Sequence, residues 1–510
     1  MEPPVTDLLV VRHNSYHDSA RLMAISRRLQ ALPGIREAEV MMGTPLNLEL
    51  LRSAGWSPTS ATPLDLVVAL RGEQENDLHA AEAALTGLLA GGETATSRHE
   101  QRPGTVAEAV ALHPGTNLVS IAVPGPYAAF VAHRALDAGR HVFLFSDNVP
   151  LADEIALKRR GIEAGLLVMG PDCGTAIVAG VGLGFANRVR RGPVGIVGAS
   201  GTGIQEVCCH LDALGVGVSH AIGTGSRDLG AAVGGCMTGL GLAVLAADPA
   251  TAVIVLVAKH PDPGVAARIH GLLAGLGKPA VVRYLGEAPP PSRDGVRYAG
   301  SLDEAATVAA KVASGDGLSS EGSGLGAQGL ASESRAKRLS GRLVGLFGGG
   351  SLAAEARLEL AQAGIEVTVP EDMLRPGAPI PGAAHIVVDT GDDAYTVGRP
   401  HPMVDQAVRC GLIRTAGADP TVDLVLLDLV LGDGAHPDPA PELAAAVRDA
   451  RRLRGDRPLA VVASVCGAAA DPQDPARQRA VLEEAGVRVE GSAVRAAWLA
   501  ATLLGATGRS

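Results

Sequence analysis

Short runs of valine, isoleucine and leucine alternate with alanine-rich segments along most of the 510-residue chain. The apolar runs predict buried strands and the alanine-rich segments predict helices, an alternation typical of α/β folds with largely parallel sheets. We expect strands at residues 7–11, 66–70, 118–123, 141–145, 194–197, 253–257, 343–347, 386–388, 424–427 and 459–463. We expect helices at residues 19–31, 127–138, 151–163, 203–214, 352–363 and 442–452.

Two breaks in this pattern divide the chain into globular blocks. Residues 314–340 are dominated at first by Gly and Ser without strand or helix periodicity, which predicts a flexible linker. A charged, proline-containing turn at residues 187–193 precedes a fresh apolar strand and marks a second boundary. The predicted domains are therefore residues 1–191, 192–313 and 341–510.

Composition narrows the function classes. Hydrophobic residues make up 47% of the chain and charged residues 19%, so a large aliphatic core can form. The net charge is -10, and Phe, Tyr and Trp together number only 12, which disfavours nucleic-acid binding. Six cysteines without a CxxC spacing predict reduced thiols and no zinc site, and we expect no bound metal.

The amino terminus does not read as a signal peptide, because it lacks a basic segment followed by an apolar stretch. Residues 229–247 form a long charge-free run that contains five glycines, which favours a buried, turn-bearing segment over a membrane span. We expect a cytoplasmic protein without membrane contact.

Two glycine-rich loops follow apolar strands and open into helices. Glycines at a helix start let the backbone approach an anion, and the exposed N–H groups there carry partial positive charge. Neither loop is a Walker A sequence, and tight packing is the competing explanation for each. The phosphate-binding candidates in these loops are Ser200, Gly201, Thr202 and Gly203, and then Gly349, Gly350 and Ser351.

Further polar candidates lie just beyond predicted strands. Lys259 ends an apolar strand, where its ammonium could neutralise phosphate, and Asp172 follows another strand in a turn that could equally bond its own backbone. In the polar segment 389–405, Arg399 could grip phosphate or carboxylate, His401 could move a proton, and Asp393 could orient either. A solvated loop stiffened by prolines is the alternative for that segment.

Six long motifs follow one another along the chain, namely VMGPDCGTAIVAG, VGIVGASGTGIQEVC, HAIGTGSRDL, FGGGSLAAEA, DDAYTVGRPHPMVD and LLDLVLGDGAHPDPA. Taken together in this order, they resemble the FdrA family. The resemblance covers nearly the whole chain and implies a Rossmann-like, CoA-binding-type N-terminal domain followed by two flavodoxin-like ligase domains of succinyl-CoA synthetase type, with mostly parallel sheets.

Three departures from the synthetase pattern matter. No histidine occurs between Tyr284 and Ser301, where the synthetase has its phosphorylated histidine, and Lys259 stands where the synthetase has the glutamate that orients that histidine. No ATP-grasp domain separates the ligase halves. The resemblance thus implies a phosphate pocket without a phosphohistidine relay or ATP use by this chain alone.

The resemblance further implies a subunit of a carbamoyltransferase that converts oxalurate and phosphate to oxamate and carbamoyl phosphate in purine and allantoin nitrogen catabolism. Partner subunits and an oligomer are expected, with phosphate and carbamoyl phosphate as substrates. Two alternatives stay open, an acyl-CoA synthetase that binds CoA and works with a partner, and a scaffolding or regulatory subunit without catalysis. The shortage of aromatic side chains is weak evidence against CoA.

Overall fold

A computed structural model describes residues 6–15, 17, 19–57, 61–90, 103–315, 338–396 and 399–506. It separates two compact units, the first made of residues 1–101 and 396–400 and the second of residues 102–395 and 401–510. Most of the predicted linker at 314–340 lies outside the described residues. Among the described residues, no helix combines the length and apolar character needed to cross a membrane.

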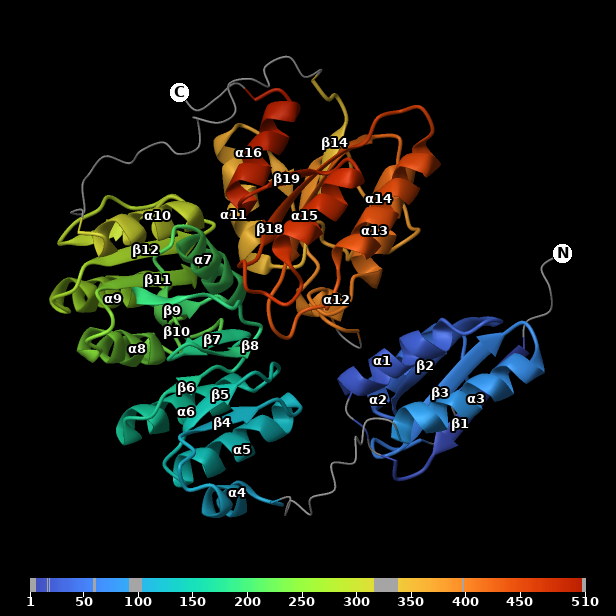
Figure 1. The fold of residues 1–510 in the computed structure, drawn as a ribbon, viewed down its shortest axis with the longest axis horizontal. Helices are drawn as coiled ribbons and strands as arrows, with labels where there is room; N and C mark the ends of the chain where they lie inside the picture. Colours follow the sequence, from blue (N-terminus) through green and yellow to red (C-terminus); the bar gives the residue numbers. More distant parts are fainter. Residues whose placement is uncertain are drawn as a thin grey trace. The chain divides into compact units, whose positions relative to one another are not determined.

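The first unit is an antiparallel α/β domain (Figure 1). Its sheet has the order β1-β3-β2, and Val68 at its centre lies opposite Val10 on one side and Val40 on the other. Helix α1 and helix α3 contribute Leu22 and Leu85 to its buried core. The elements are β1 (Thr6–Arg12), α1 (Ser19–Gln30), β2 (Ile35–Met42), α2 (Pro45–Ser53), β3 (Leu66–Gly72) and α3 (Glu75–Ala90).

This unit corrects the prediction of one Rossmann-like region at residues 1–191. Apolar runs such as 66–70 were recognised as strands, but hydrophobicity does not reveal whether a neighbouring strand runs parallel or antiparallel. The rest of that region belongs to the second unit, and its last two strands join the sheet of the following domain. The expected α/β class with mostly parallel sheets is confirmed for the chain as a whole.

The second unit begins with a small parallel domain. Its sheet has the order β4-β5-β6, formed by β4 (Leu118–Ile121), β5 (His141–Leu144) and β6 (Val168–Met169). The accompanying helices are α4 (Val106–Leu112), α5 (Gly125–Asp137) and α6 (Leu151–Ala164). A Cβ atom added to Gly125 would clash with the backbone carbonyl of Asp147, so this glycine serves close packing at the start of α5.

A seven-stranded sheet of order β13-β12-β11-β9-β10-β7-β8 follows. Neighbouring strands are parallel except in the pairs β10–β7 and β7–β8, which are antiparallel. Residues alternate between its faces, so Val255 and Val257 of β11 face one core while Leu256 and Ala258 face another. The elements are β7 (Thr175–Val178), β8 (Val181–Gly184), β9 (Arg191–Ala199), α7 (Gly201–Ala213), β10 (Val218–Gly223), α8 (Cys236–Ala247), β11 (Val253–Lys259), α9 (Pro263–Gly275), β12 (Ala280–Leu285), β13 (Val296–Tyr298) and α10 (Leu302–Ala313).

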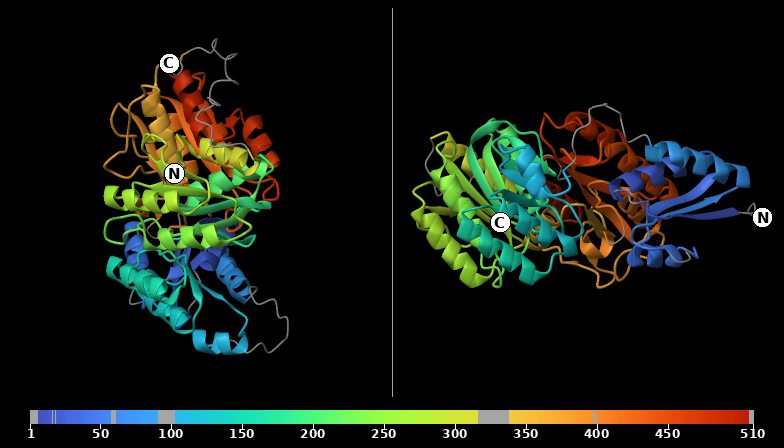
Figure 2. Two further views of the ribbon diagram at one scale, coloured as in Figure 1. Left: turned by 90° about the vertical axis from the view of Figure 1, so that its left-hand side faces the viewer. Right: turned by 90° about the horizontal axis from the view of Figure 1, so that it is seen from below.

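The last domain is built on a six-stranded parallel sheet of order β15-β16-β14-β17-β18-β19. The elements are β14 (Arg342–Phe347), α11 (Gly350–Gln362), β15 (Val367–Thr368), β16 (His385–Asp389), α12 (Asp393–Thr396), α13 (Ala407–Ala418), β17 (Val422–Val430), α14 (Ala440–Arg454), β18 (Ala460–Cys466), α15 (Pro475–Glu484), β19 (Arg488–Glu490) and α16 (Ala493–Leu503). Figure 2 shows the two large domains from two further directions.

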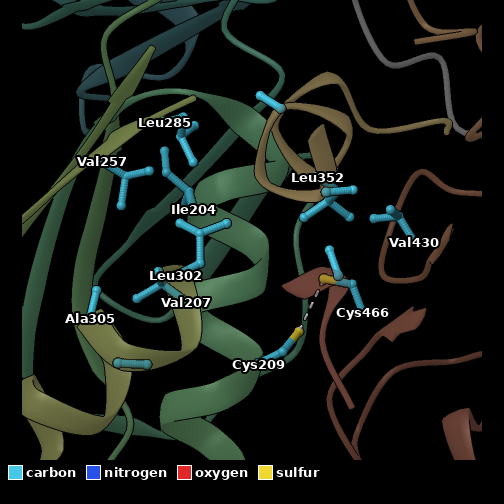
Figure 3. Packing of buried hydrophobic residues seen from close by; sticks show 14 of the residues in the cluster. Ile204, Val207, Cys209, Val257, Leu285, Leu302, Ala305, Leu352, Val430 and Cys466 are labelled. Carbon is cyan, nitrogen blue, oxygen red and sulfur yellow. Dashed lines mark hydrogen bonds between the residues drawn. The ribbon is translucent and has the colours of Figure 1, made fainter. Parts of the chain in front are cut away.

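Helices α7, α10, α11 and α16 share one hydrophobic core with both large sheets. Ile204 and Val207 of α7 and Leu352 of α11 lie in this common core (Figure 3). The thiols of Cys209 and Cys466 meet there at 3.8 Å, one from each domain. Burial raises the pKa of Cys209, and the hydrogen bond to Cys209, together with burial, raises the pKa of Cys466. The two domains are thereby held as one body, and the first turns of α7 and α11 are fixed relative to each other.

A buried ion pair also joins these domains. The guanidinium of Arg283 on β12 donates from Nε to Glu355 Oε1 of α11 at 2.6 Å, and the Leu302 amide donates to Glu355 Oε2 at 3.0 Å. Both side chains are about 1% exposed or less. Burial raises the pKa of Glu355 to about 7, and Arg283 opposes this shift. Because removal of either partner would leave the other charge buried and unpaired, the contact stabilises the domain junction only as an intact pair.

We expect the substitution Glu355→Leu to lower the free energy of unfolding by about 3–5 kcal/mol, because it leaves Arg283 charged and unpaired in the core. The double variant Arg283→Met, Glu355→Leu should recover most of that loss, since no buried charge remains. Urea unfolding of wild type and both variants measures this. Equal losses in the single and double variants would contradict a role for the unpaired charge.

Candidate functional site

The first turns of α7 and α11 meet between the two large domains. The hydroxyls of Ser200, which precedes α7, and Ser351, in the first turn of α11, share a hydrogen bond, and both side chains are buried. A Cβ atom on Gly349 would lie 3.0 Å from the Thr202 methyl group, so only glycine permits this approach. The sequence-predicted loops are therefore brought together, helix start to helix start.

Not every amide of the two loops remains available for an anion. Ser200 Oγ accepts from the Gly203 amide at 3.1 Å and so caps α7. In the other loop the Gly349 amide donates to Asp428 at 2.8 Å. The amides of Gly203 and Gly349 are thus engaged within the protein, and their expected contact with phosphate stays a prediction. The amides of Gly201 and Thr202 of α7 and of Gly350 and Ser351 of α11 lack intrahelical acceptors.

Asp428 is the buried anchor of the second loop. Its two carboxylate oxygens accept from the Gly348 amide at 2.7 Å and the Gly349 amide at 2.8 Å, and Arg409 Nη2 lies 3.1 Å from Oδ1. Burial raises the pKa of Asp428, while Arg409 and the two amides favour the charged form. Sequence reasoning missed this residue, although an aspartate inside the apolar run LVLLDLVL of β17 was the available signal.

Lys259 and Asp389 converge on the first residue of α11. Lys259 ends β11 of one domain, and Asp389 ends β16 of the other. A Cβ atom on Gly350 would lie 2.8 Å from Lys259 Nζ and would clash with Asp389 Oδ2, so both side chains end beside this glycine. Burial raises the pKa of Asp389 to about 6, and Lys259 opposes the shift. The site thus pairs a cation with a carboxyl group that titrates near neutrality.

Asp389 was also missed by sequence reasoning, which chose Asp393 from the same polar segment. A Cβ atom on Gly391 would lie 3.1 Å from Asp389 Oδ1, 2.6 Å from His401 Nε2 and 2.8 Å from the Gly348 carbonyl oxygen. Asp389 also accepts from the Gly391 amide at 2.9 Å. Its place as the last residue of a parallel strand was the signal that could have identified it.

His401 belongs to the site, but its surroundings give it a different role from the one predicted. Its Nδ1 accepts from the Met403 amide at 3.1 Å, which places the proton of the neutral ring on Nε2. Burial and the nearby Arg409 lower the pKa of His401 to about 4. At neutral pH the ring is therefore a fixed hydrogen-bond donor, and Asp389 is better suited to exchange a proton.

Asp172 and Asp393 lie at the margin of the site. Asp172 is in an exposed turn with φ of 55° and accepts from the Ser226 hydroxyl at 2.6 Å. Crowding by protein atoms removes water from its carboxylate and raises its pKa, Asp147 and Asp393 add repulsion, and Lys259 opposes the shift. Removal from water and Asp147 likewise raise the pKa of Asp393. The Lys259 charge acts on Asp172, and in the described part of the chain neither carboxylate accepts a hydrogen bond from a loop amide of α7 or α11.

Arg399 is grouped with the first compact unit, unlike the other predicted site residues. Its amide donates to the Thr396 carbonyl at 3.0 Å. The structure therefore does not add Arg399 to the site described above, and its expected contact with phosphate stays a prediction.

Two family matches cover different parts of the chain. Residues 5–105 match the family described as "AllF, heavy metal-associated domain", and residues 346–503 match the CoA-ligase family. The first of the six cysteines is Cys173, so residues 5–105 contain no thiolate for a soft metal ion. Among the described residues, no group of three or more His, Cys, Asp or Glu side chains could hold a metal. The residues present do not fit the metal that the family description implies.

Comparison with solved structures includes the apo dinucleotide-forming acetyl-coenzyme A synthetase 1 of Ca. Korarchaeum cryptofilum. It is 16% identical with a TM-score of 0.32, and the match covers 76% of this chain and 82% of that chain.

Sequence relatives cover different shares of the chain. The Archaeoglobus fulgidus succinate–CoA ligase [ADP-forming] subunit alpha 1 is 30% identical over 215 residues, which are 41% of this chain and 70% of that protein. The Escherichia coli (strain K12) protein named "Uncharacterized protein YahF" is 36% identical over 506 residues, which are 96% of this chain and 97% of that protein. With near full-length similarity to YahF and a CoA-ligase domain at its carboxyl end, the chain belongs to the FdrA family of succinyl-CoA synthetase-like proteins.

Proposed function

We propose that this chain transfers an acyl group to or from phosphate at the paired starts of α7 and α11, as a subunit of a ligase-type enzyme. The observation that carries the proposal is the convergence of Lys259 and Asp389 on Gly350, beside the hydrogen-bonded pair Ser200 and Ser351. Amides without intrahelical acceptors and a lysine suit a phosphate dianion, and a carboxyl group with its pKa near 6 suits proton transfer.

In the direction of phosphate attack, an oxygen of HPO₄²⁻ forms a bond to the acyl carbon, and the bond from that carbon to the leaving sulfur or nitrogen breaks. The phosphate proton passes to Asp389 and then to the leaving group, which departs as a thiol or amide. The products are the acyl phosphate and the protonated leaving group, so atoms and charge balance. Lys259 and the amides of Gly350 and Ser351 neutralise the phosphate oxygens.

The relatives favour CoA as the partner of the acyl group. The CoA-ligase match and the succinate–CoA ligase relatives support a thioester reaction, with nucleotide chemistry supplied by a separate subunit. In this version the chain exchanges an acyl phosphate and CoA for an acyl-CoA and phosphate.

A second candidate is carbamoyl transfer, in which oxalurate and phosphate give oxamate and carbamoyl phosphate. The observation that favours it is the construction of the small β4-β5-β6 domain. Dinucleotide-binding folds hold pyrophosphate at a glycine-rich turn from the first strand into a helix, but the turn from β4 into α5 has a single glycine, Gly125, between two prolines. This turn therefore lacks the glycine-rich loop that would hold the CoA phosphates.

One assay separates the candidates. The chain is combined with the products of neighbouring genes and given phosphate with either an acyl-CoA or oxalurate, and acyl phosphate and carbamoyl phosphate are trapped with hydroxylamine. Phosphate-dependent loss of an acyl-CoA supports the first candidate, and carbamoyl phosphate from oxalurate supports the second. Neither product from an assembled, folded complex would reject both and leave a scaffolding role.

A further inference from the structure

A cavity of about 870 Å³ lies at the amino-terminal edge of the six-stranded sheet. It is lined by the first residues of β14 and β16, the start of β17 and the end of α14, with four arginines among the lining residues. The glycine loop of the proposed phosphate site follows the other end of β14, roughly 17 Å away along the strand. The cavity is therefore separate from that site. We call it the arginine pocket, and its charged or imidazole side chains are Arg338, Arg342, His385, Asp423, Arg454 and Arg457.

The two inner arginines are held by the protein. Arg342 donates to backbone carbonyls of residues 380–382, to Thr421 Oγ1 at 2.8 Å and to Asp419 at 2.8 Å. Arg454 donates to the Asp419 carbonyl at 3.1 Å and pairs with Asp423, but its buried Nε has no hydrogen-bond partner among the described residues. Arginines at helix carboxyl ends commonly offset the helix dipole, which accounts for Arg454 at the end of α14.

Neither an ion pair nor a helix carboxyl end accounts for the two outer arginines. Arg338 and Arg457 are exposed, and within the described part of the chain neither forms an ion pair with a carboxylate. Arg457 donates to the Pro420 carbonyl. Burial lowers the pKa of Arg454, and repulsion from Arg457 adds to the shift. Like charges are thus held together here without a full set of counter-charges.

The remaining groups also favour an anion. His385 Nδ1 accepts from the Leu343 amide at 2.8 Å, so the neutral ring carries its proton on Nε2 and acts as a donor. Among the described residues these four guanidinium groups have two carboxylate partners, Asp419 for Arg342 and Asp423 for Arg454, which leaves Arg338 and Arg457 without a paired carboxylate there. The volume is within the range of small-molecule sites. Guanidinium groups bind phosphate and carboxylate oxygens in a bidentate manner.

We propose that the arginine pocket binds a small anion that carries two linked phosphate groups. The charges of Arg338 and Arg457 meet the two groups, and the His385 N–H supplies a further donor at the pocket wall. A second anion site of this kind, away from the site of acyl transfer, would let a phosphorylated metabolite bind without competing with phosphate.

Inorganic pyrophosphate and inorganic phosphate serve as probes in calorimetric titrations of the full chain at 0.15 M salt. We expect the variant Arg338→Ala, Arg457→Ala to bind pyrophosphate at least tenfold more weakly than wild type. The matched control is Arg448→Ala, which removes an exposed arginine of α14 that does not line the pocket and should leave binding unchanged. Both replaced arginines are exposed, so melting curves should confirm that the double variant stays folded.

Two further titrations define the site. Pyrophosphate should bind Lys259→Met as it binds wild type, since Lys259 ends a strand of the seven-stranded sheet and lies beside Gly350, beyond the other end of β14. Inorganic phosphate should bind the pocket at least tenfold more weakly than pyrophosphate. Unchanged pyrophosphate binding by the double arginine variant would overturn the proposal. Loss of that binding in Lys259→Met, or equal affinity for the two probes, would overturn it as well.

Discussion

The substitution Lys259→Met should lower kcat/KM for phosphate by about 10³-fold in the acyl-transfer assay. Removal of one preorganised donor to a developing oxyanion costs about 10²–10³-fold, and Lys259 contributes a full charge in addition to hydrogen bonds. Methionine keeps the length and apolar stem of the side chain, so the packing beside Gly350 should survive. Steady-state rates at several phosphate concentrations measure the effect.

Two controls make this result specific to charge at that position. Lys259→Arg keeps a cation and should recover part of the activity. Lys278→Met removes a lysine that lies just before β12, at the far end of that strand, and whose ammonium donates to two backbone carbonyls. This second variant should leave kcat/KM for phosphate unchanged. Lys259→Met should also raise the apparent pKa of Asp389 above about 6, because the opposing positive charge is gone. Full activity in a folded Lys259→Met complex would remove Lys259 from the mechanism.

The strand and helix pattern of the second unit could be predicted because each local signal agrees with the fold. Apolar runs such as 253–257 became parallel strands buried on both faces, and both glycine loops became helix starts. The meeting of Ser200 with Ser351 could be expected only from the family resemblance, since 151 residues separate them in the chain. Local pattern alone carries no information on such long-range pairing.

The site chemistry was predicted less well than the loops that hold it. Sequence reasoning favoured His401 as the proton carrier because histidine usually titrates near neutrality, but burial and Arg409 lower its pKa to about 4. An aspartate side chain is usually fully ionised near neutral pH, yet burial raises the pKa of Asp389 to about 6. The pKa values of these two residues therefore depend on packing, which the local sequence does not show.

The first unit shows the same limit for backbone structure. Residues 66–70 form a strand as expected, but its partners β1 and β2 run antiparallel to it. The alternating exposure of β2, with Val40 and Met42 inward and Glu37 and Glu39 outward, was a signal of a half-buried antiparallel strand. That signal separates this unit from the parallel domains that follow.

The substitution Asp389→Asn should lower kcat by about 10²-fold and remove the pH dependence that Asp389 causes. General acid–base catalysis contributes about 10²–10⁴-fold, and asparagine keeps the shape of the side chain without exchanging a proton. In wild type the carboxylate form is populated above its pKa of about 6, so the rate of phosphate attack should rise as pH increases through 6 and level off above 7. In the variant that rise should be absent.

Stability gives an independent check with a fixed sign. The pKa of Asp389 is raised from 3.8 to about 6 on folding, so the folded chain binds the proton more tightly than the unfolded chain does. Its contribution to stability is therefore present below about pH 4 and declines as pH rises to about 6. Asp389→Asn should lack this decline and should be at least as stable as wild type at pH 7.

The matched control is Asp392→Asn, which changes a carboxylate three residues away. Asp392 repels the charged form of Asp389, so its removal should move the rise in rate to slightly lower pH and leave the plateau rate unchanged. Rate profiles from pH 5 to 8 on the three proteins test the assignment together. A rise near pH 6 that persists in Asp389→Asn would assign the proton transfer to another group. A plateau rate in Asp389→Asn equal to that of wild type would show that Asp389 is not required.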